Sequence, residues 1–229
     1  MIDSLKVTSP APTLVRVPGG VFTMGSSQPD RFANGTEKPP QRIEIKSFYL
    51  AQFPVTENQW REFAMKSGGS ELPVVNISWF EAVAFTEWLS DRTERAFRLP
   101  TEAEWEYACR AGSETIFSSG DMITINDANF LYDDRGARVG PGGRTKQGCY
   151  PANAFGLEDM HGNVCEWVAD VWRPHYAMQA EDYDDAPRVI RGGAWDYLPR
   201  LLRSAWRDWA PPDMRRDNLG FRVACDLEP

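Results

Sequence analysis

The sequence predicts an α+β domain with little regular secondary structure, in which strands near the two ends of the chain enclose a few early helices. Apolar and polar residues alternate near the N-terminus and again near the C-terminus, as is typical of half-buried strands. Between these regions, three short segments begin with helix-capping sequences. Because strands and helices are segregated along the chain, we expect the terminal strands to pair with each other.

The first strand signals lie within residues 15–24 and 42–50. Residues 15–24 contain Pro-Gly-Gly, which predicts a turn followed by a strand. Residues 42–50 alternate apolar and polar side chains, which predicts one half-buried strand.

Three helices are predicted from capping boxes, in which a hydroxyl and a carboxylate or amide satisfy the free amides of the first turn. The pairs are Thr56 with Gln59, Ser78 with Glu81, and Thr101 with Glu104. The third helix is expected to end at Gly112, since glycine readily adopts the left-handed conformation that ends helices. On that helix we interpret Glu104 as the capping partner, and Glu102 and Glu106 as surface charges.

Between residues 112 and 188 the helix and strand signals largely vanish, and short strands are predicted again at 189–191, 202–207 and 219–225. In the last of these, Leu219, Phe221 and Val223 share one face. The chain contains no linker, repeat or low-complexity tract, so we expect one domain over residues 1–229.

The composition excludes several classes of protein. A net charge of −8 and a pI near 4.9 argue against nucleic acid as a partner, because nucleic-acid binding needs a broad basic face. No apolar run approaches membrane-spanning length, and the N-terminus lacks the pattern of a signal peptide. We therefore expect a cytoplasmic protein with no membrane partner.

The four cysteines and two histidines do not form a recognisable metal or catalytic motif. Cys109, Cys149, Cys165 and Cys225 are far apart and lack zinc-finger spacing, so we expect free buried thiols. His161 and His175 are isolated, and we interpret both as structural.

The most unusual composition occurs in residues 191–225, which contain seven Arg, three Trp and four Asp but no Lys or Glu. This segment carries a formal charge of +3 in an acidic chain. Arg and Trp are enriched at the centres of interfaces, so the pattern favours a displayed binding surface. The alternative is a purely structural lattice of Arg and Trp.

Several blocks, in order, resemble the formylglycine-generating enzyme family. They cover nearly the whole chain and comprise residues 54–56 (PVT), 98–108 (RLPTEAEWEYA), 155–157 (FGL), 162–167 (GNVCEW), 191–195 (RGGAW) and 219–222 (LGFR). The resemblance implies that family's variant of the C-type lectin-like fold.

The resemblance does not extend to the family's catalytic cysteines. Its enzymes oxidise a cysteine in sulfatases with a pair of copper-binding cysteines that follow the Arg-Gly-Gly block. Residues 191–224 contain no cysteine. Since a thiolate binds the soft metal and carries the redox chemistry, we expect no copper and favour a non-catalytic protein. The alternative is an oxidase of this type, or a relative with altered chemistry.

The same segment also resembles the variable proteins of diversity-generating retroelements, which display variable residues on this fold. The matching scaffold is residues 191–193, Trp195, 199–200, 203–205, Arg207, 212–213, Arg215 and 220–222. The positions between these scaffold residues form the predicted binding face, so we expect the surface of segment 191–217 to bind an unknown protein or small-molecule ligand. These positions are Asp196, Tyr197, Leu198, Leu201, Trp206, Asp208, Trp209, Ala210, Pro211, Met214, Arg216 and Asp217.

Three of these positions depart from the retroelement pattern. Adenine mutagenesis of an asparagine codon cannot produce Trp206, Trp209 or Met214, and an ordinary member of the family would show the same scaffold. Either origin predicts that these three side chains are partly exposed on one contiguous surface, while Trp195, Arg203 and Phe221 belong to the scaffold.

A calcium site is implied by the resemblance at Asp159, Gly162, Val164 and Glu166. The carboxylates of Asp159 and Glu166 and the carbonyls of Gly162 and Val164 would be the ligands, in a tight loop that suits a hard cation. The alternative is that the two carboxylates only satisfy buried donors. A second family calcium site, beginning near Asn129, stays open.

Overall fold

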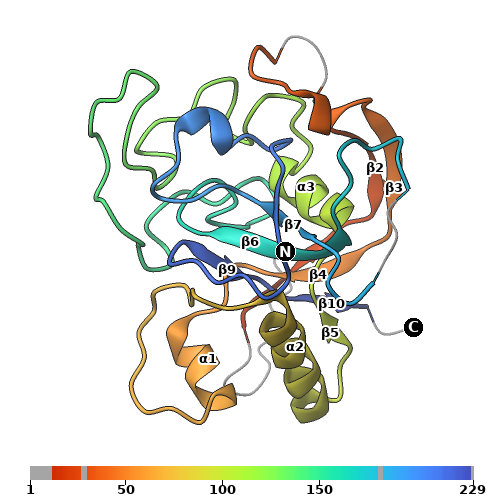
Figure 1. Ribbon diagram of the computed structural model, residues 1–229, viewed down its shortest axis with the longest axis vertical. Coiled ribbons are helices and arrows are strands. Elements are labelled where there is room, and N and C mark those ends of the chain that lie inside the picture. Colours follow the sequence, from red (N-terminus) through yellow and green to blue (C-terminus); the bar gives the residue numbers. More distant parts are fainter. Residues whose placement is uncertain (1–11, 27–29, 180–182, 228–229) are drawn as a thin grey trace.

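The computed structural model describes residues 12–26, 30–179 and 183–227 and has the predicted α+β architecture (Figure 1). Helices α1 and α2 lie together on one side of the strands, and α3 lies on the other (Figure 1). The strands are β1 (Leu14–Val17), β2 (Gly20–Met24), β3 (Gln41–Ile45), β4 (Phe48–Ala51), β5 (Phe97–Arg98), β6 (Cys165–Val171), β7 (Arg188–Arg191), β8 (Asp208–Ala210), β9 (Leu219–Phe221) and β10 (Ala224–Asp226). The helices are α1 (Glu57–Phe63), α2 (Trp79–Thr93) and α3 (Glu102–Arg110), with short 3-10 turns η1 (Gly35–Glu37) and η2 (Pro199–Leu201).

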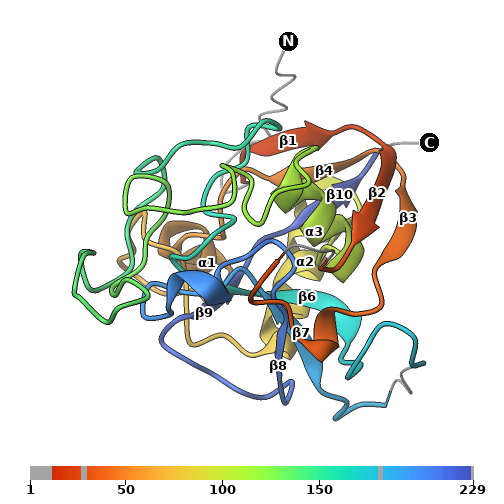
Figure 2. The same ribbon diagram turned by 90° about the horizontal axis from the view of Figure 1, so that it is seen from above.

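One sheet joins the two ends of the chain, as predicted. Its strand order is β1-β4-β10-β5, and β4 pairs antiparallel with both β1 and β10 (Figure 2). Leu50 lies opposite Val15 on one side and Ala224 on the other. The buried strand β4 therefore connects the first and last strands.

A second four-stranded sheet, in the order β8-β7-β6-β9, supports the Arg-rich segment. Its central strand β6 pairs antiparallel with β7 and parallel with β9, so that Glu166 lies opposite both Arg191 and Gly220. The sequence did not predict β6. The first four residues of this strand are buried, and a strand covered on both faces lacks the polar–apolar alternation by which half-buried strands are recognised.

All three predicted helices are present, each with both hydrogen bonds of its capping box. Helix α3 ends at Arg110, and the left-handed residue that ends it is Ala111, at φ 47°, rather than Gly112. Short helices such as these depend on tertiary packing for their stability.

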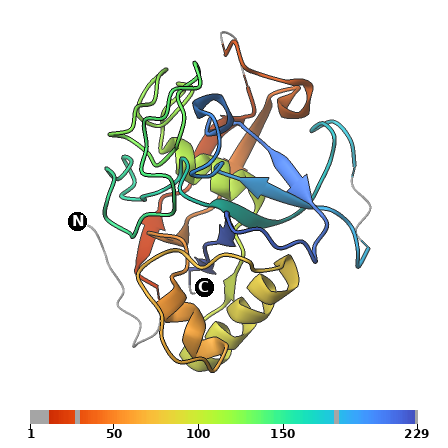
Figure 3. The ribbon, with the colours of Figure 1, turned by 60° about the vertical axis from the view of Figure 1, so that its left-hand side comes forward.

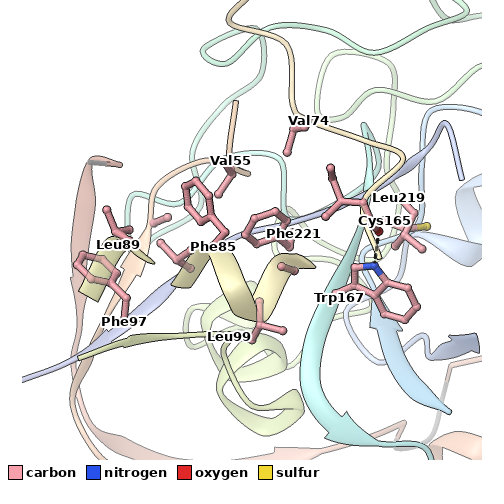
Figure 4. Close-up of a cluster of buried hydrophobic side chains, with 14 of the residues drawn as sticks. Val55, Val74, Phe85, Leu89, Phe97, Leu99, Cys165, Trp167, Leu219 and Phe221 are labelled. Atoms are coloured by element: carbon pink, nitrogen blue, oxygen red, sulfur yellow. Dashed lines mark hydrogen bonds between the residues drawn. The ribbon is translucent and has the colours of Figure 1, made fainter. Parts of the chain in front are cut away.

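A large apolar cluster lies between α2 and the second sheet (Figure 4). The rings of Phe85 and Phe221 are 5.4 Å apart, and the indole of Trp167 donates to the carbonyl of Ile77 at 2.9 Å. A Cβ atom at Gly220 would lie 2.2 Å from the carbonyl oxygen of Val74, so this close approach requires glycine. The Gly-Phe-Arg block is thus explained by packing.

Three predicted strands differ from the observed ones. Residues 42–50 divide into β3 and β4, and residues 219–225 divide into β9 and β10. Residues 202–207 form no strand, because the carbonyls of Ser204 and Ala205 accept hydrogen bonds from the Arg191 guanidinium. The Arg191 side chain therefore satisfies carbonyls that a neighbouring strand would otherwise pair with.

A search of the described residues finds no helix that is both long and apolar enough to cross a membrane.

Candidate binding site

The Arg-rich segment is fixed to the domain by buried ion pairs, the first of which centre on Arg191 and Arg207. Arg191 has no solvent exposure and donates to Glu106 at 2.6 Å and to Glu102 at 3.4 Å. Arg207 donates to both carboxylate oxygens of Glu102, at 2.5 and 2.9 Å. Helix α3 therefore supplies the anions for two arginines of the segment.

These contacts correct the prediction that Glu102 and Glu106 are surface charges. Both side chains are almost completely buried. They lie four positions apart on the side of α3 that faces the second sheet, where the guanidinium groups compensate their charge. Glu104, in contrast, caps the helix as predicted and also pairs with Arg98 at 2.7 Å.

Arg203 joins the segment to the loop that precedes β3. Its guanidinium donates to Glu37 at 2.6 and 2.8 Å and to Asp30 at 2.6 Å. Neither acid was singled out from the sequence, because nothing in the local pattern marks them as partners of a residue more than 160 positions away.

The fourth ion pair joins Arg222, which lies between β9 and β10, to Glu166 on β6. Both oxygens of Glu166 accept from the Arg222 guanidinium at 2.7 Å, and Glu166 Oε2 also accepts from the Trp105 indole at 2.8 Å. The remaining guanidinium hydrogens reach backbone carbonyls, including those of Ala51 and Glu158. For these four arginines, the structural-lattice interpretation is correct.

The positions between the arginines are mostly accessible to solvent. Of the twelve predicted binding residues, the exposed ones are Asp196, Trp209, Pro211, Met214 and Asp217. The half-buried ones are Tyr197, Leu198, Leu201, Asp208 and Arg216. The scaffold prediction is confirmed for Arg203 and Phe221, which are buried, whereas Trp195 is half-buried.

Two of the predicted binding residues are buried, which contradicts their assignment to an exposed face. Trp206 is 6% exposed and packs edge-on against the Tyr197 ring at 5.6 Å. Ala210 is 1% exposed and lies opposite Arg188 in the second sheet. We therefore assign Trp206 and Ala210 to the scaffold.

A polar cluster forms where Tyr197, Asp208 and Arg216 meet beside Cys165. Asp208 and Arg216 form a half-exposed ion pair at 3.6 Å. Burial, together with the neighbouring Cys165 thiol, raises the pKa of Tyr197 above its ordinary value, so its hydroxyl remains protonated. Nearby, Asn218 donates to Asp196 at 2.8 Å. The half-exposed pair offers a carboxylate and a guanidinium to a ligand, whereas the Tyr197 hydroxyl lies against the buried Cys165 thiol.

The prediction of one contiguous exposed surface for Trp206, Trp209 and Met214 is wrong, because Trp206 is buried while Trp209 and Met214 are exposed. Successive strand residues point to opposite faces, and Trp209 accordingly stacks near Trp172, at 6.4 Å, rather than beside Asp208. Met214 closes a turn with Pro211.

The cysteines have the environment of structural thiols. Cys109, Cys165 and Cys225 are free and buried, as predicted, while Cys149 is exposed. Burial raises the pKa of Cys109 to about 12 and that of Cys165 above its ordinary value. A thiol that stays protonated is a poor nucleophile and a poor metal ligand.

The loop of the expected calcium site combines one carboxylate that has an unpartnered oxygen with one that is fully paired. Asp159 is 7% exposed, its Oδ2 atom has no hydrogen-bond partner among the described residues, and burial raises its pKa to about 7. Glu166 instead accepts from Arg222 and Trp105. The two carboxylates therefore have different environments, and Asp159 carries the unused oxygen.

The two histidines also differ. His161 is buried, and its Nδ1 donates to the Leu202 carbonyl at 2.7 Å, so its Nε2 accepts from the Ser118 amide at 3.1 Å. Burial lowers the pKa of His161 to about 4, which keeps the ring neutral. These bonds agree with a structural role. His175 is exposed.

Comparison with known proteins gives relatives of more than one activity. The chain is 28% identical to the formylglycine-generating enzyme of Bos taurus, over 96% of this chain and 76% of that protein. It is 31% identical to the hercynine oxygenase of Mycolicibacterium smegmatis, over 95% of this chain and 62% of that protein. It is also 29% identical to the inactive C-alpha-formylglycine-generating enzyme 2 of Mus musculus, over 93% of this chain and 85% of that protein.

Solved structures agree with the fold. PvdO from Pseudomonas aeruginosa superposes with a TM-score of 0.87 and 29% identity, over 98% of both chains. Variable protein 1 of Treponema denticola has the same fold, with a TM-score of 0.79 at 22% identity, over 98% of this chain and 99% of that one. Residues 2–227 match the sulfatase-modifying factor enzyme 1-like domain. The chain therefore belongs to the formylglycine-generating enzyme–sulfatase (FGE-sulfatase) family.

Proposed function

We propose that this chain is a non-catalytic ligand-binding protein, which binds a protein or small molecule through the accessible residues of segment 191–217. The observation that carries this proposal is the division within the segment. Arg191, Arg203 and Arg207, and Arg222 just beyond it, are buried in ion pairs, whereas ten of the twelve intervening residues reach solvent. A rigid frame with accessible intervening side chains is the arrangement that display of a binding surface requires.

The polar cluster would orient such a ligand through its charged groups. Asp208 and Arg216 offer opposite charges that are each about one-third exposed, beside the half-buried ring of Tyr197. Tyr and Arg are the residues that most often dominate binding energy at interfaces. Because this cluster and Trp209 lie on different faces of β8, the polar cluster is the centre of the proposed site.

The alternative, an oxidase of the family or a relative with altered chemistry, lacks its nucleophiles here. Residues 191–224 contain no cysteine, and burial raises the pKa values of Cys109, Cys165 and Cys225, so these three thiols stay protonated. The murine relative is named inactive, so membership of the family is compatible with a non-catalytic role.

The first prediction concerns the binding surface. We expect peptides selected from a random display library on the immobilised protein to bind the variant Tyr197→Ser/Asp208→Ser/Arg216→Ser roughly tenfold more weakly or worse. The measurement is surface plasmon resonance of each selected peptide. The matched control, Met65→Ser/Met178→Ser, changes exposed residues elsewhere and should leave affinity unchanged. If most peptides bind the triple variant as well as the native protein, the binding site lies elsewhere.

The second prediction concerns catalysis. Incubation with copper, oxygen and a sulfatase-type cysteine peptide should produce no aldehyde beyond a copper-only control, as measured by mass spectrometry of the peptide. The same assay with an active family enzyme is the positive control. Turnover by this protein above the copper-only rate would refute the non-catalytic proposal.

We also propose a calcium ion at the Asp159 loop. The unpartnered, buried Oδ2 atom of Asp159 favours a cation, and the carbonyls of Gly162 and Val164 would complete the ligand set with Glu166. Glu166 would share its carboxylate with Arg222, so Asp159 is the residue on which the site depends. The ion would hold the loop in place, with no catalytic role.

The third prediction follows from ligand linkage. An ion that binds only the folded state raises its stability, so a chelator should lower the melting temperature of the native protein. Asp159→Asn should abolish that difference, because it removes the free charge while keeping the side-chain shape. Glu114→Gln, an exposed change outside the loop, should retain it. Identical melting curves with and without chelator, at added millimolar calcium, would rule out a folding-linked ion.

A further inference from the structure

A small pocket of about 150 Å³ lies between the loop that follows α3 and the segment that leads into β6. Figure 3 shows the long irregular segment after α3 gathered on one side of the molecule. Exposed residues of both segments, among them Ser119 and Ala154, form the mouth of the pocket. Its floor is buried and contains Leu157, Asp159 and His161. A pocket of this volume holds roughly six non-hydrogen atoms, which is the size of benzene.

The charged side chains in the lining of this pocket are acidic. Asp127 and Asp159 supply carboxylates, and no lysine or arginine among the described residues lines the pocket. His161 adds no positive charge, because burial lowers its pKa to about 4. The charge of Asp127 also acts on the His161 ring, and His161 is two residues from Asp159, so both carboxylates belong to the same small space. The pocket is therefore negatively charged.

Both carboxylates retain an oxygen atom that is not used within the fold. Asp127 accepts from the amide and the hydroxyl of Thr124 through Oδ2, at 2.8 and 2.7 Å, and its Oδ1 has no hydrogen-bond partner in the described part of the chain. The Oδ2 atom of Asp159, which is 7% exposed, is likewise without a partner there. Arg222, whose charge acts on Asp159, is bonded to both oxygens of Glu166. Carboxylates with unused capacity in a partly buried pocket favour a cationic hydrogen-bond donor.

The remaining walls favour an organic cation over a metal ion. Five of the eleven lining residues are apolar, namely Pro151, Ala152, Ala154, Leu157 and Met160. A hard metal ion needs oxygen ligands on most sides, which these walls do not supply. His161 has no ring nitrogen left for a metal, since Nδ1 donates to the Leu202 carbonyl and Nε2 accepts from the Ser118 amide. An alkylammonium ion instead combines three N–H donors with an apolar stem.

We propose that this pocket binds a primary alkylammonium group, with the ammonium at Asp127 and Asp159 and the apolar stem against Leu157. The group is carried either by a free amine or by the side chain of a lysine, because both present the same chemistry to a pocket of this size. The pocket shares only Asp159 with the residues of the expected calcium site. It contains none of the predicted binding residues of segment 191–217, so it does not depend on the proposed function.

The test compares three probes of similar size on the whole protein, n-butylammonium, 1-butanol and butyrate, by the chemical shifts of the backbone amides. The titrations contain a chelator, so that calcium does not compete for Asp159, and are run at pH 8, where a carboxyl with a pKa of about 7 is ionised. Butylammonium should saturate with a Kd on the order of 1 mM and shift resonances of residues 118–127 and 151–161, and the other two should bind more weakly. A fourth probe, Nα-acetyl-lysinamide, distinguishes the sources: tighter binding than butylammonium assigns the pocket to a lysine side chain, and weaker binding assigns it to a free amine.

The variant Asp127→Asn should weaken butylammonium roughly two- to fivefold, because it removes one charge and keeps an acceptor for Thr124. The matched control is Asp121→Asn, which removes an exposed carboxylate of the same loop outside the pocket and should leave the affinity unchanged. Asp127 lies outside the expected calcium site, so Asp127→Asn should also leave the effect of chelator on melting unchanged. Failure of the calcium proposal is thereby distinguished from failure of the amine site.

Three outcomes would overturn the proposal. Binding of butanol or butyrate as tight as that of butylammonium would show that the carboxylates do not select the charge of the occupant. Shifts that map away from residues 118–127 and 151–161, or no saturation by any probe, would show that the pocket is not an amine site. Equal affinity of Asp127→Asn and Asp121→Asn for butylammonium would remove Asp127 from the site.

Discussion

The structure depends on the pairing of buried guanidinium and carboxylate groups. Arg191, Arg203, Arg207 and Arg222 reach from the C-terminal segment to acids on α3, on β6 and in the loop before β3. Removing such groups from water is costly unless every charge is paired and hydrogen-bonded, so loss of one partner destabilises strongly. Here the guanidinium groups also bond to backbone carbonyls, which fixes a segment with few strand partners.

The sequence predicted those features that rest on local signals. Each capping box marked a helix correctly, and the order of the blocks from residue 54 to residue 222 indicated the fold. Strand β6 was missed because it is covered on both faces, and residues 202–207 were misassigned because the side chain of Arg191 satisfies their carbonyls. The buried roles of Glu102 and Glu106 could not be predicted, since their partners lie 85 to 105 residues further along the chain.

The residues of the segment that hold the fold together differ from the residues that are proposed to bind a ligand. Buried ion pairs fix the positions of the four arginines, whereas the side chains of Asp208 and Arg216 are partly exposed and can differ with little loss of packing. Of the predicted face, Trp206 was misjudged because it lies between buried Ala205 and Arg207 and packs inward onto the ring of Tyr197. Which side chains of the predicted face are exposed could therefore be determined only from the structure.

The central claim is that buried ion pairs hold a segment whose intervening residues are free for binding. The most direct test is a library of single substitutions in residues 191–225, in which protease resistance measures the folding of each variant. The account predicts that Arg191, Arg203, Arg207, Trp206 and Arg222 tolerate almost no replacement, whereas Asp208, Trp209, Met214 and Arg216 tolerate most. Equal intolerance at both sets of positions would contradict the account, because the segment would then be architecture throughout.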